Sequence, residues 1–166
     1  MAVGAPEPLA EHHDLAAFSC GVQSLDDWLR RRARSNQASG TSRTFVACDG
    51  ASVVAYYALA SGAVSAAEAP GRFRRNMPDP IPVAVLGRLA VDQAYAGKGL
   101  GRALMRDCSR RVMQAAESIG IRGVIVHAIS EDAKAFYLAQ GLDVSPVQPM
   151  TLMVTLADLG LNALPT

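Results

Sequence analysis

The chain has 166 residues, half of them apolar, and a formal net charge of +1. This length and apolar content are enough for one buried core, so we expect residues 1–166 to form a single domain. The chain contains no run of roughly 20 apolar residues and no basic-then-apolar signal pattern at its start, so we expect a cytoplasmic protein without membrane contact.

The first half of the chain predicts a helix, a hairpin and a loop. Ser24 matches the N-cap of a capping box, and apolar residues at helical spacing predict a helix over 25–38. The apolar runs of residues 44–59 flank Asp49-Gly50, which favours the tight turn of a β-hairpin. Residues 66–82 contain four prolines and no periodicity, which predicts a long surface loop.

The second half alternates strand and helix patterns. An apolar run over 83–91 predicts a buried strand, and apolar residues at helical spacing predict a helix from Leu100 to Ile119. A strand over 123–127 and a helix over 130–140 follow, and residues 142–155 predict a final hairpin. This order of elements indicates an α/β fold with a mixed sheet.

A glycine-rich loop, "AYAGKGLGRAL" over 94–104, joins the apolar strand to the long helix. The first backbone N–H groups of a helix lack intrahelical partners, so glycines that let a ligand approach create an anion site there. A Walker A loop is excluded because Gly99 follows Lys98, and a dinucleotide fingerprint is disfavoured because Leu104 stands at the third glycine position. The loop therefore indicates a phosphate or pyrophosphate site, or a turn that only tightens the connection.

The segment "LGRLAVDQAYAGKGLGRAL", followed by "VIVHAIS" and "DAKAFYLAQGL", resembles the GCN5-related N-acetyltransferases (GNAT family). The order of elements is also similar over nearly the whole chain. The resemblance implies the GNAT fold, a mixed and mostly antiparallel sheet that splays at its central parallel strands and is flanked by helices. It implies acetyl-CoA as the acetyl donor.

The resemblance also implies the cofactor-binding residues. Gly99 and Gly101 align with the signature glycines of the R/Q-x-x-G-x-G/A loop, whereas Ala96 departs from the R/Q position. Lys98, Arg102 or the backbone must then supply the phosphate contact. The expected cofactor residues are Leu89, Ala90, Val91, Ala96, Gly97, Lys98, Gly99, Leu100, Gly101, Arg102, Ser130, Ala133 and Phe136.

Direct attack of a substrate amine on the thioester is the mechanism that the resemblance implies. Tyr137 stands where family members keep the general acid. A phenol with an ordinary pKa of about 10 is protonated at neutral pH and can protonate the departing thiolate. Glu131 and Asp132 fit the first turn of their helix better than a general base, so no base is assigned.

A narrower resemblance comes from "FSCGVQSLDDWLRRRARSNQASGTSRTFVA", which is similar to the acetyltransferase toxins of toxin–antitoxin modules. That resemblance implies the α-amine of aminoacyl-tRNA as the acceptor, a homodimer, and a ribbon-helix-helix antitoxin as partner. The alternatives are an acetyltransferase of small-molecule or peptide amines and a non-catalytic acyl-CoA-binding regulator, because the fold does not determine the acceptor.

Basic residues are concentrated in the middle of the chain. Residues 30–111 contain 14 Arg or Lys and 5 Asp or Glu, a balance of +9, and the remainder carries −8. Arginines on the predicted helices 25–38 and 100–119 and in the long loop could contact tRNA phosphates or form solvated faces. The expected tRNA-binding residues are Arg30, Arg31, Arg34, Arg72, Arg74 and Arg75.

We expect no metal site. The three cysteines lack CxxC spacing, and adjacent His12 and His13 should point apart without a third ligand, as a solvated pair. Trp28 fits the apolar core. Arg88 lies inside an apolar strand and needs a partner, either in a ligand cleft or in a buried pair.

Overall fold

The computed structural model of the chain describes residues 2–163, and side chains over 2–160. Met1 and residues 164–166, which the expected single domain includes, lie outside the described residues. The described chain forms two compact units, residues 2–60 with 87–104 and residues 61–86 with 105–163. Strands β3 (Ser52–Val64) and β4 (Ile81–Val91) each run from one unit into the other.

The strands form one mixed sheet of seven, in the order β1-β2-β3-β4-β5-β7-β6. The β4–β5 pairing is parallel and joins only Ala84–Leu86 to Val124–Val126, while the pairings β1–β2, β2–β3, β5–β7 and β6–β7 are antiparallel. This architecture, with helices beside the sheet, confirms the expected mixed α/β fold. The remaining strands are β1 (Glu7–Pro8), β2 (Arg43–Asp49), β5 (Gly123–His127), β6 (Asp143–Val144) and β7 (Thr151–Thr155).

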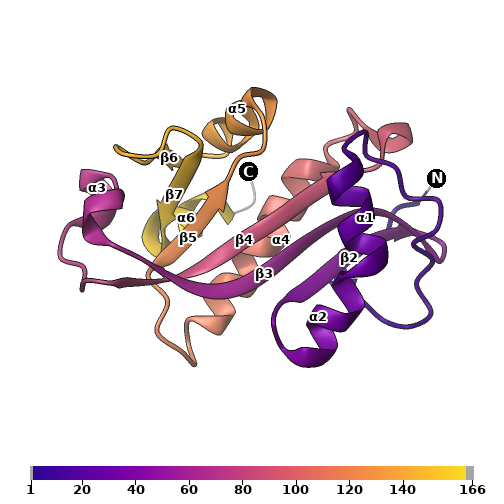
Figure 1. Ribbon diagram of the computed structural model, residues 1–166, viewed down its shortest axis with the longest axis horizontal. Coiled ribbons are helices and arrows are strands. Elements are labelled where there is room, and N and C mark those ends of the chain that lie inside the picture. Colours follow the sequence, from indigo (N-terminus) through magenta and orange to yellow (C-terminus); the bar gives the residue numbers. More distant parts are fainter. Residues whose placement is uncertain (1, 164–166) are drawn as a thin grey trace. The chain divides into compact units, whose positions relative to one another are not determined.

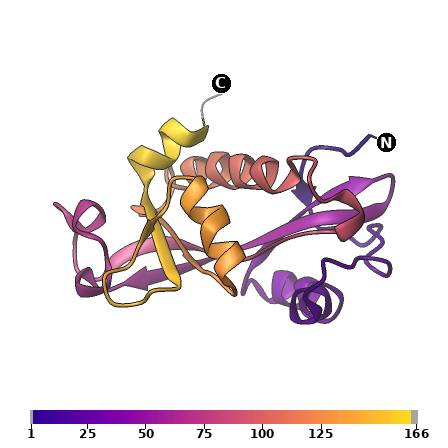
Figure 2. The same ribbon diagram turned by 90° about the horizontal axis from the view of Figure 1, so that it is seen from above.

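In the first unit, helices α1 (Gln23–Arg31) and α2 (Ala33–Ser39) lie beside β2 and β3, on one side of these strands (Figures 1 and 2). The buried face of α1 carries Trp28 and Leu29, which belong to one core cluster with Val46 and Tyr56 of the strands. The Tyr56 hydroxyl donates to the Leu25 carbonyl at 2.7 Å. Burial and this hydrogen bond together attach α1 to the sheet.

The expected single helix over 25–38 is wrong, because two helices meet at Arg32, whose φ of −121° is not helical. Hydrogen bonds to residues distant in the sequence hold α2 as a separate helix. The Arg34 guanidinium donates to the carbonyl of His13 at 2.6 Å, and the Gln37 side chain bonds both Leu9 O and Thr44 N. These bonds to neighbouring segments outweigh the local preference for one continuous helix.

The expected capping box at Ser24 is also wrong. The helix begins earlier, with Val22 as its N-cap residue, so Ser24 lies inside the first turn and caps nothing. Asp26 instead accepts a hydrogen bond from the backbone N–H of Cys20 at 2.9 Å, and this bond holds the segment that leads into the helix.

The expected hairpin is confirmed, with a longer second strand. Asp49 pairs with Ser52, so the turn residues are Gly50 and Ala51, and Gly50 has the positive φ of 65° that this turn requires. The expected loop over 66–82 contains two short helices, η1 (Ala66–Glu68) and α3 (Gly71–Arg74). Prolines and a four-residue helix leave too little periodicity for a sequence pattern.

The second unit contains β5 to β7 with helices α3, α5 (Glu131–Ala139) and α6 (Leu156–Ala163), each of which contacts β7 (Figures 1 and 2). Strand β5 has the expected bounds, and α5 and the β6–β7 hairpin lie where the sequence predicts them. Helix α4 (Leu100–Ala115) starts in the first unit and is shorter than expected. Among the described residues, none of the helices combines the length and apolarity needed to cross a bilayer.

Close packing at Gly123 holds α3 against β5. A Cβ built on Gly123 would collide with the Val154 carbonyl oxygen and lie 2.6 Å from Phe73 Cε2, and Phe73 is the buried residue of α3. Only a glycine on β5 lets the Phe73 ring approach this closely. The buried Phe73 side chain therefore anchors the basic segment around α3 to the sheet.

We expect Gly123→Ala to destabilise the protein by about 1–3 kcal/mol, because overpacking here displaces backbone and an aromatic ring. Gly71→Ala is the matched control, since nothing lies within 4 Å of its Cβ position. Urea unfolding of both variants measures the difference. Equal midpoints for Gly123→Ala and Gly71→Ala would show that the Phe73 contact does not constrain the fold.

Candidate active site

The glycine loop is entered through a hydrogen-bonded turn in the first unit. Asp92 caps the short helix η2 (Gln93–Tyr95) by accepting from Ala94 N at 2.9 Å, and its other oxygen accepts from Ser19 N at 3.0 Å. Gln93 N donates to Ser19 O at 2.9 Å, and the Tyr95 hydroxyl donates to Asp49 at 2.6 Å. These hydrogen bonds fix the turn that precedes Gly97.

Gly97 and Gly99 hold the loop in a conformation that L-residues rarely adopt, with φ of 76° and 80°. Nothing lies within 4 Å of a Cβ built on either residue, so the glycines serve the backbone conformation and leave open space in front of it. Helix α4 begins directly after, at Leu100. The N–H groups of its first turn, including those of Gly101 and Arg102, therefore have no intrahelical acceptor.

Two side chains of this loop, those of Lys98 and Arg102, were expected to contribute phosphate contacts in place of the R/Q side chain. Ala96 is exposed in an extended conformation and offers only its backbone. Lys98 lies with its Nζ 5.4 Å from the centroid of the Tyr95 ring, and Arg102 is exposed on the first turn of α4. The loop thus combines unpaired amides, a partial positive helix charge and two cations, which fit an anionic phosphate or pyrophosphate.

The end of β4 leads into this loop. Ala90 is buried in the core cluster of the first unit, while Leu89 and Val91 are partly exposed. Asp92 N donates to Val54 O at 2.8 Å, so β3 still holds the chain where β4 ends. Because the Ala90 side chain is buried in the core, residues 89–91 can contact a ligand only through their backbone groups and the side chains of Leu89 and Val91.

Helix α5 of the second unit carries the expected general acid. Ser130 is its N-cap and accepts from Ala133 N at 3.1 Å. Tyr137 is 7% exposed, and burial raises the pKa of its phenol to about 12. Phe136 lies edge-on to Tyr137 at 5.3 Å between ring centroids. Within the part of the chain that the structure describes, the Tyr137 hydroxyl makes no hydrogen bond, so it can donate its proton to a ligand.

The cysteines are not activated as nucleophiles. Burial raises the pKa of Cys20 and Cys48 to about 11 each and that of Cys108 to about 12. A thiol must be deprotonated to attack a thioester, so these three side chains are inert near neutral pH. This agrees with a direct attack by the acceptor amine rather than a covalent enzyme intermediate.

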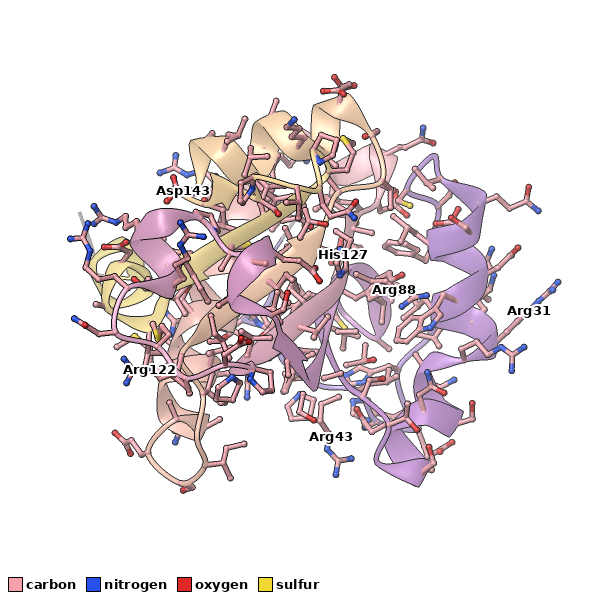
Figure 3. The ribbon with its side chains drawn as sticks, turned by 60° about the vertical axis from the view of Figure 1, so that its left-hand side comes forward. Arg31, Arg43, Arg88, Arg122, His127 and Asp143 are labelled. Atoms are coloured by element: carbon pink, nitrogen blue, oxygen red, sulfur yellow. The ribbon has the colours of Figure 1, made fainter. Side chains whose placement is uncertain are left out.

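The expected tRNA-binding arginines of α1 and α2 fall into two kinds. Arg30 donates to Phe18 O at 2.7 Å and lies 3.7 Å from Asp27, and Arg34 donates to carbonyls of the N-terminal segment. Arg31 extends from α1 into solvent (Figure 3) and makes no hydrogen bond or ion pair in the described chain. Of the three, Arg31 is free to meet a polyanion.

The expected arginines around α3 differ in the same way. Arg72 forms a two-pronged pair with Asp158 of α6, at 2.8 Å for both contacts, and this hydrogen bond lowers the pKa of Asp158. Arg74 and Arg75 are exposed. The pair fixes the position of Arg72, whereas Arg74 and Arg75 remain available to an external anion.

The histidine pair is not the solvated pair that the sequence suggested. His13 is 4% exposed, and Glu7, His12 and His13 bring their ligand atoms within 4.8 Å of one another. The His13 Nδ1 accepts from Ala10 N at 2.9 Å, so its Nε2 carries the ring proton and donates it to Glu7 at 2.6 Å. That Nε2 has no lone pair for a metal, and the cluster is explained as a hydrogen-bonded pair that holds β1.

The sequence left the partner of Arg88 open. Arg88 of β4 lies with its guanidinium carbon 4.5 Å from the centroid of the Trp28 ring, so Arg88 and Trp28 form a cation–π pair. A period-2 or helical pattern does not show which strand residue meets which helix residue, so this contact could not be predicted.

Comparison with known proteins identifies the class. Residues 40–141 match the family described as "Acetyltransferase (GNAT) domain". The chain belongs to the GNAT acetyltransferase family, as its fold and its glycine loop indicate.

Two curated relatives extend over most of the chain. A protein of Mycobacterium tuberculosis (strain ATCC 25618 / H37Rv) named tRNA-acetylating toxin is 51% identical over 154 residues, which cover 93% of this chain and 93% of the relative. A protein of Sinorhizobium fredii (strain NBRC 101917 / NGR234) named probable toxin TacT is 32% identical over 165 residues, 92% of this chain and 91% of that protein.

Solved structures agree in fold. AtaT complexed with acetyl-methionyl-tRNAfMet is 26% identical, with a TM-score of 0.89 over 96% of this chain and 98% of that one. A mutant AtaT toxin bound to the C-terminus of the antitoxin AtaR is 25% identical, with a TM-score of 0.83 over 97% and 96%. AtaTR bound with AcCoA is 26% identical, with a TM-score of 0.83 over 96% of each chain.

We expect Gly99→Ala to weaken acetyl-CoA binding about tenfold, because a Cβ at positive φ costs about 1–2 kcal/mol and the loop relaxes away from its open conformation. Isothermal titration calorimetry measures the dissociation constant. Gly71→Ala is the control, because Gly71 does not have a positive φ. An unchanged constant for Gly99→Ala would contradict the role of the loop backbone.

The Tyr137 phenol should stay protonated at pH 10, where an ordinary tyrosine is half ionised, and should ionise only as the pH approaches 12. Because its folded pKa is above the unfolded value of 10.0, its contribution to stability is complete below pH 10 and is lost between pH 10 and 12. Ultraviolet difference titration of the protein against Tyr137→Phe isolates this group. A phenolate near pH 9 would contradict the buried environment.

Proposed function

We propose that this chain is the toxin of a toxin–antitoxin pair that transfers acetyl from acetyl-CoA to the α-amine of aminoacyl-tRNA and thereby blocks translation. The observation that carries the proposal is the 51% identity to a tRNA-acetylating toxin along 93% of both chains. The glycine loop and the protonated tyrosine described above supply the matching chemistry.

The loop residues fit the acetyl donor. Acetyl-CoA supplies a reactive thioester and a pyrophosphate. The N–H groups at the start of α4 have no intrahelical acceptor, so they can bind phosphate oxygens without breaking helix hydrogen bonds. Lys98 and Arg102 add positive charge where the family keeps an R/Q side chain and this chain has Ala96. The backbone of Leu89, Ala90 and Val91 is proposed to bind the pantetheine arm, with Ser130, Ala133 and Phe136 as further cofactor contacts.

Tyr137 is the proposed general acid. When the acceptor amine bonds to the acetyl carbon and the carbon–sulfur bond breaks, the Tyr137 Oη–H donates its proton to the leaving thiolate. The amine loses a proton in the same reaction, and that proton restores the phenol through solvent. The hydroxyl suits this role because it has no hydrogen bond within the described chain and burial keeps it protonated.

Exposed arginines support an RNA acceptor. Arg31, Arg74 and Arg75 have no carboxylate partner among the described residues and can meet phosphates. Arg30, Arg34 and Arg72 are proposed to shape this surface, because each is engaged in an internal contact. RNA bound in this way is recognised by shape and backbone rather than by base sequence.

The partners follow from the same proposal. We expect the chain to act in the cytoplasm, where charged tRNA is found, as one catalytic domain over residues 1–166 and as a homodimer. A ribbon-helix-helix antitoxin is the proposed neutralising partner. The antitoxin-bound AtaT structure, which shares this fold, supports a protein inhibitor of this kind.

Transfer of radiolabelled acetyl from acetyl-CoA to acid-precipitable charged tRNA tests the function. We expect Tyr137→Phe to lower kcat by about 10²- to 10⁴-fold and to leave KM for acetyl-CoA nearly unchanged, because the lost hydroxyl acts on the transition state. Deacylated tRNA is the acceptor control.

Three outcomes would contradict the proposal. Labelling of deacylated tRNA would place acetyl on a group other than the aminoacyl amine. Transfer to small amines but not to charged tRNA would support the small-molecule alternative. Acetyl-CoA binding without any transfer would support the non-catalytic alternative.

A further inference from the structure

Arg88 is a half-buried cation without an anionic partner. Its guanidinium lies over the Trp28 ring, and no carboxylate or carbonyl of the described chain accepts a hydrogen bond from it. The ring compensates part of the charge but takes none of the five N–H donors in a conventional hydrogen bond. A half-buried guanidinium that is held against a ring and has no protein acceptor can bind an anion with its N–H groups.

The Arg88 side chain opens into a cavity of about 260 Å³ in the first unit. Three arginines and one carboxylate line it, and the carboxylate, Asp27, already faces Arg30 at 3.7 Å. Arg31 and Arg32 are exposed on the rim, and neither side chain has a hydrogen-bond or ion-pair partner within residues 2–160. The Ser24 hydroxyl adds a polar group. The lining residues are Ser24, Asp27, Trp28, Arg31, Arg32 and Arg88.

We propose that this cavity binds a phosphate of the RNA acceptor, with Arg88 as the fixed donor and Arg31 and Arg32 as rim contacts. The assignment to RNA rests on the proposed function. Three cations around one small cavity match a phosphodiester and its neighbours along a strand better than a single carboxylate. The planar fork of Arg88, held against Trp28, presents paired N–H groups to two phosphate oxygens.

The geometry favours a polymer over a free phosphate ion. Arg88 of β4 lies over the Trp28 ring in the cavity, whereas Arg31 points from α1 into solvent (Figure 3). Successive phosphates of one strand can contact Arg88 in the cavity and Arg31 at its rim together. Arg88 therefore extends the tRNA-binding residues beyond those that the sequence indicated.

Fluorescence anisotropy with labelled, deacylated tRNA tests the site without acetyl transfer. We expect Arg88→Gln to weaken tRNA binding about tenfold and to reduce the slope of log affinity against log salt by about one. Arg43→Gln is the control, because Arg43 is exposed on β2 outside the cavity and its loss changes the net charge equally. This control should bind within about twofold of the parent protein.

Arg88→Lys keeps the charge but lacks the planar fork, so it should restore the salt slope and only part of the affinity. The double variant Arg31→Gln with Arg32→Gln alters only exposed residues and keeps the test valid if Arg88→Gln fails to fold. Thermal unfolding of each variant confirms its folded state.

Several results would overturn the site. Parent-like tRNA binding by both Arg88→Gln and the rim double variant would do so. An increased KM for acetyl-CoA with unchanged tRNA binding would assign the cavity to the donor's phosphates instead. Inorganic phosphate that protects the protein thermally without competing with tRNA would show a free-ion site. If the variants lose tRNA binding but the parent protein acetylates no charged tRNA, the RNA site stands and the proposed function fails.

Discussion

The backbone amides at the start of α4 are the groups on which the proposed chemistry depends. Helix geometry leaves them without intrahelical acceptors, and Gly97 and Gly99 give the preceding loop its positive φ angles. Hydrogen bonds of Asp92 to Ser19 and of Tyr95 to Asp49 hold the preceding turn in place. In the proposed function these amides bind the phosphates of acetyl-CoA, a role that needs no particular side chain at position 96 and is therefore compatible with Ala96.

Protonation states in the buried interior point to the same reaction. Burial keeps Tyr137 protonated and keeps Cys108 a thiol, so a proton donor is present while a nucleophilic thiolate is not. The arginines fall into two groups, those with and those without a partner inside the chain. Arg34 and Arg72 bond internal acceptors and shape the fold, whereas Arg31 and Arg88 have none and can bind an external anion.

Sequence patterns predicted β5, α5, the first hairpin and the glycine loop, because each depends on local periodicity, turn residues or a helix cap. They failed where tertiary contacts decide. The break at Arg32 arises because Arg34 and Gln37 bond distant segments, and His13 is buried because Glu7 and Ala10 satisfy its ring. The stacking of Arg88 on Trp28 joins residues 60 positions apart, which no local pattern can indicate.

The central claim is that the acceptor is the α-amine of an aminoacyl group on tRNA. Mass spectrometry of aminoacyl-adenosines released by nuclease, after incubation of the protein with acetyl-CoA and a pool of charged tRNAs, tests it most directly. We predict N-acetylated aminoacyl-adenosine that is absent with Tyr137→Phe, and its mass identifies the amino acid. Aminoacyl-adenosines that all remain unacetylated, although the protein binds acetyl-CoA, would contradict the account.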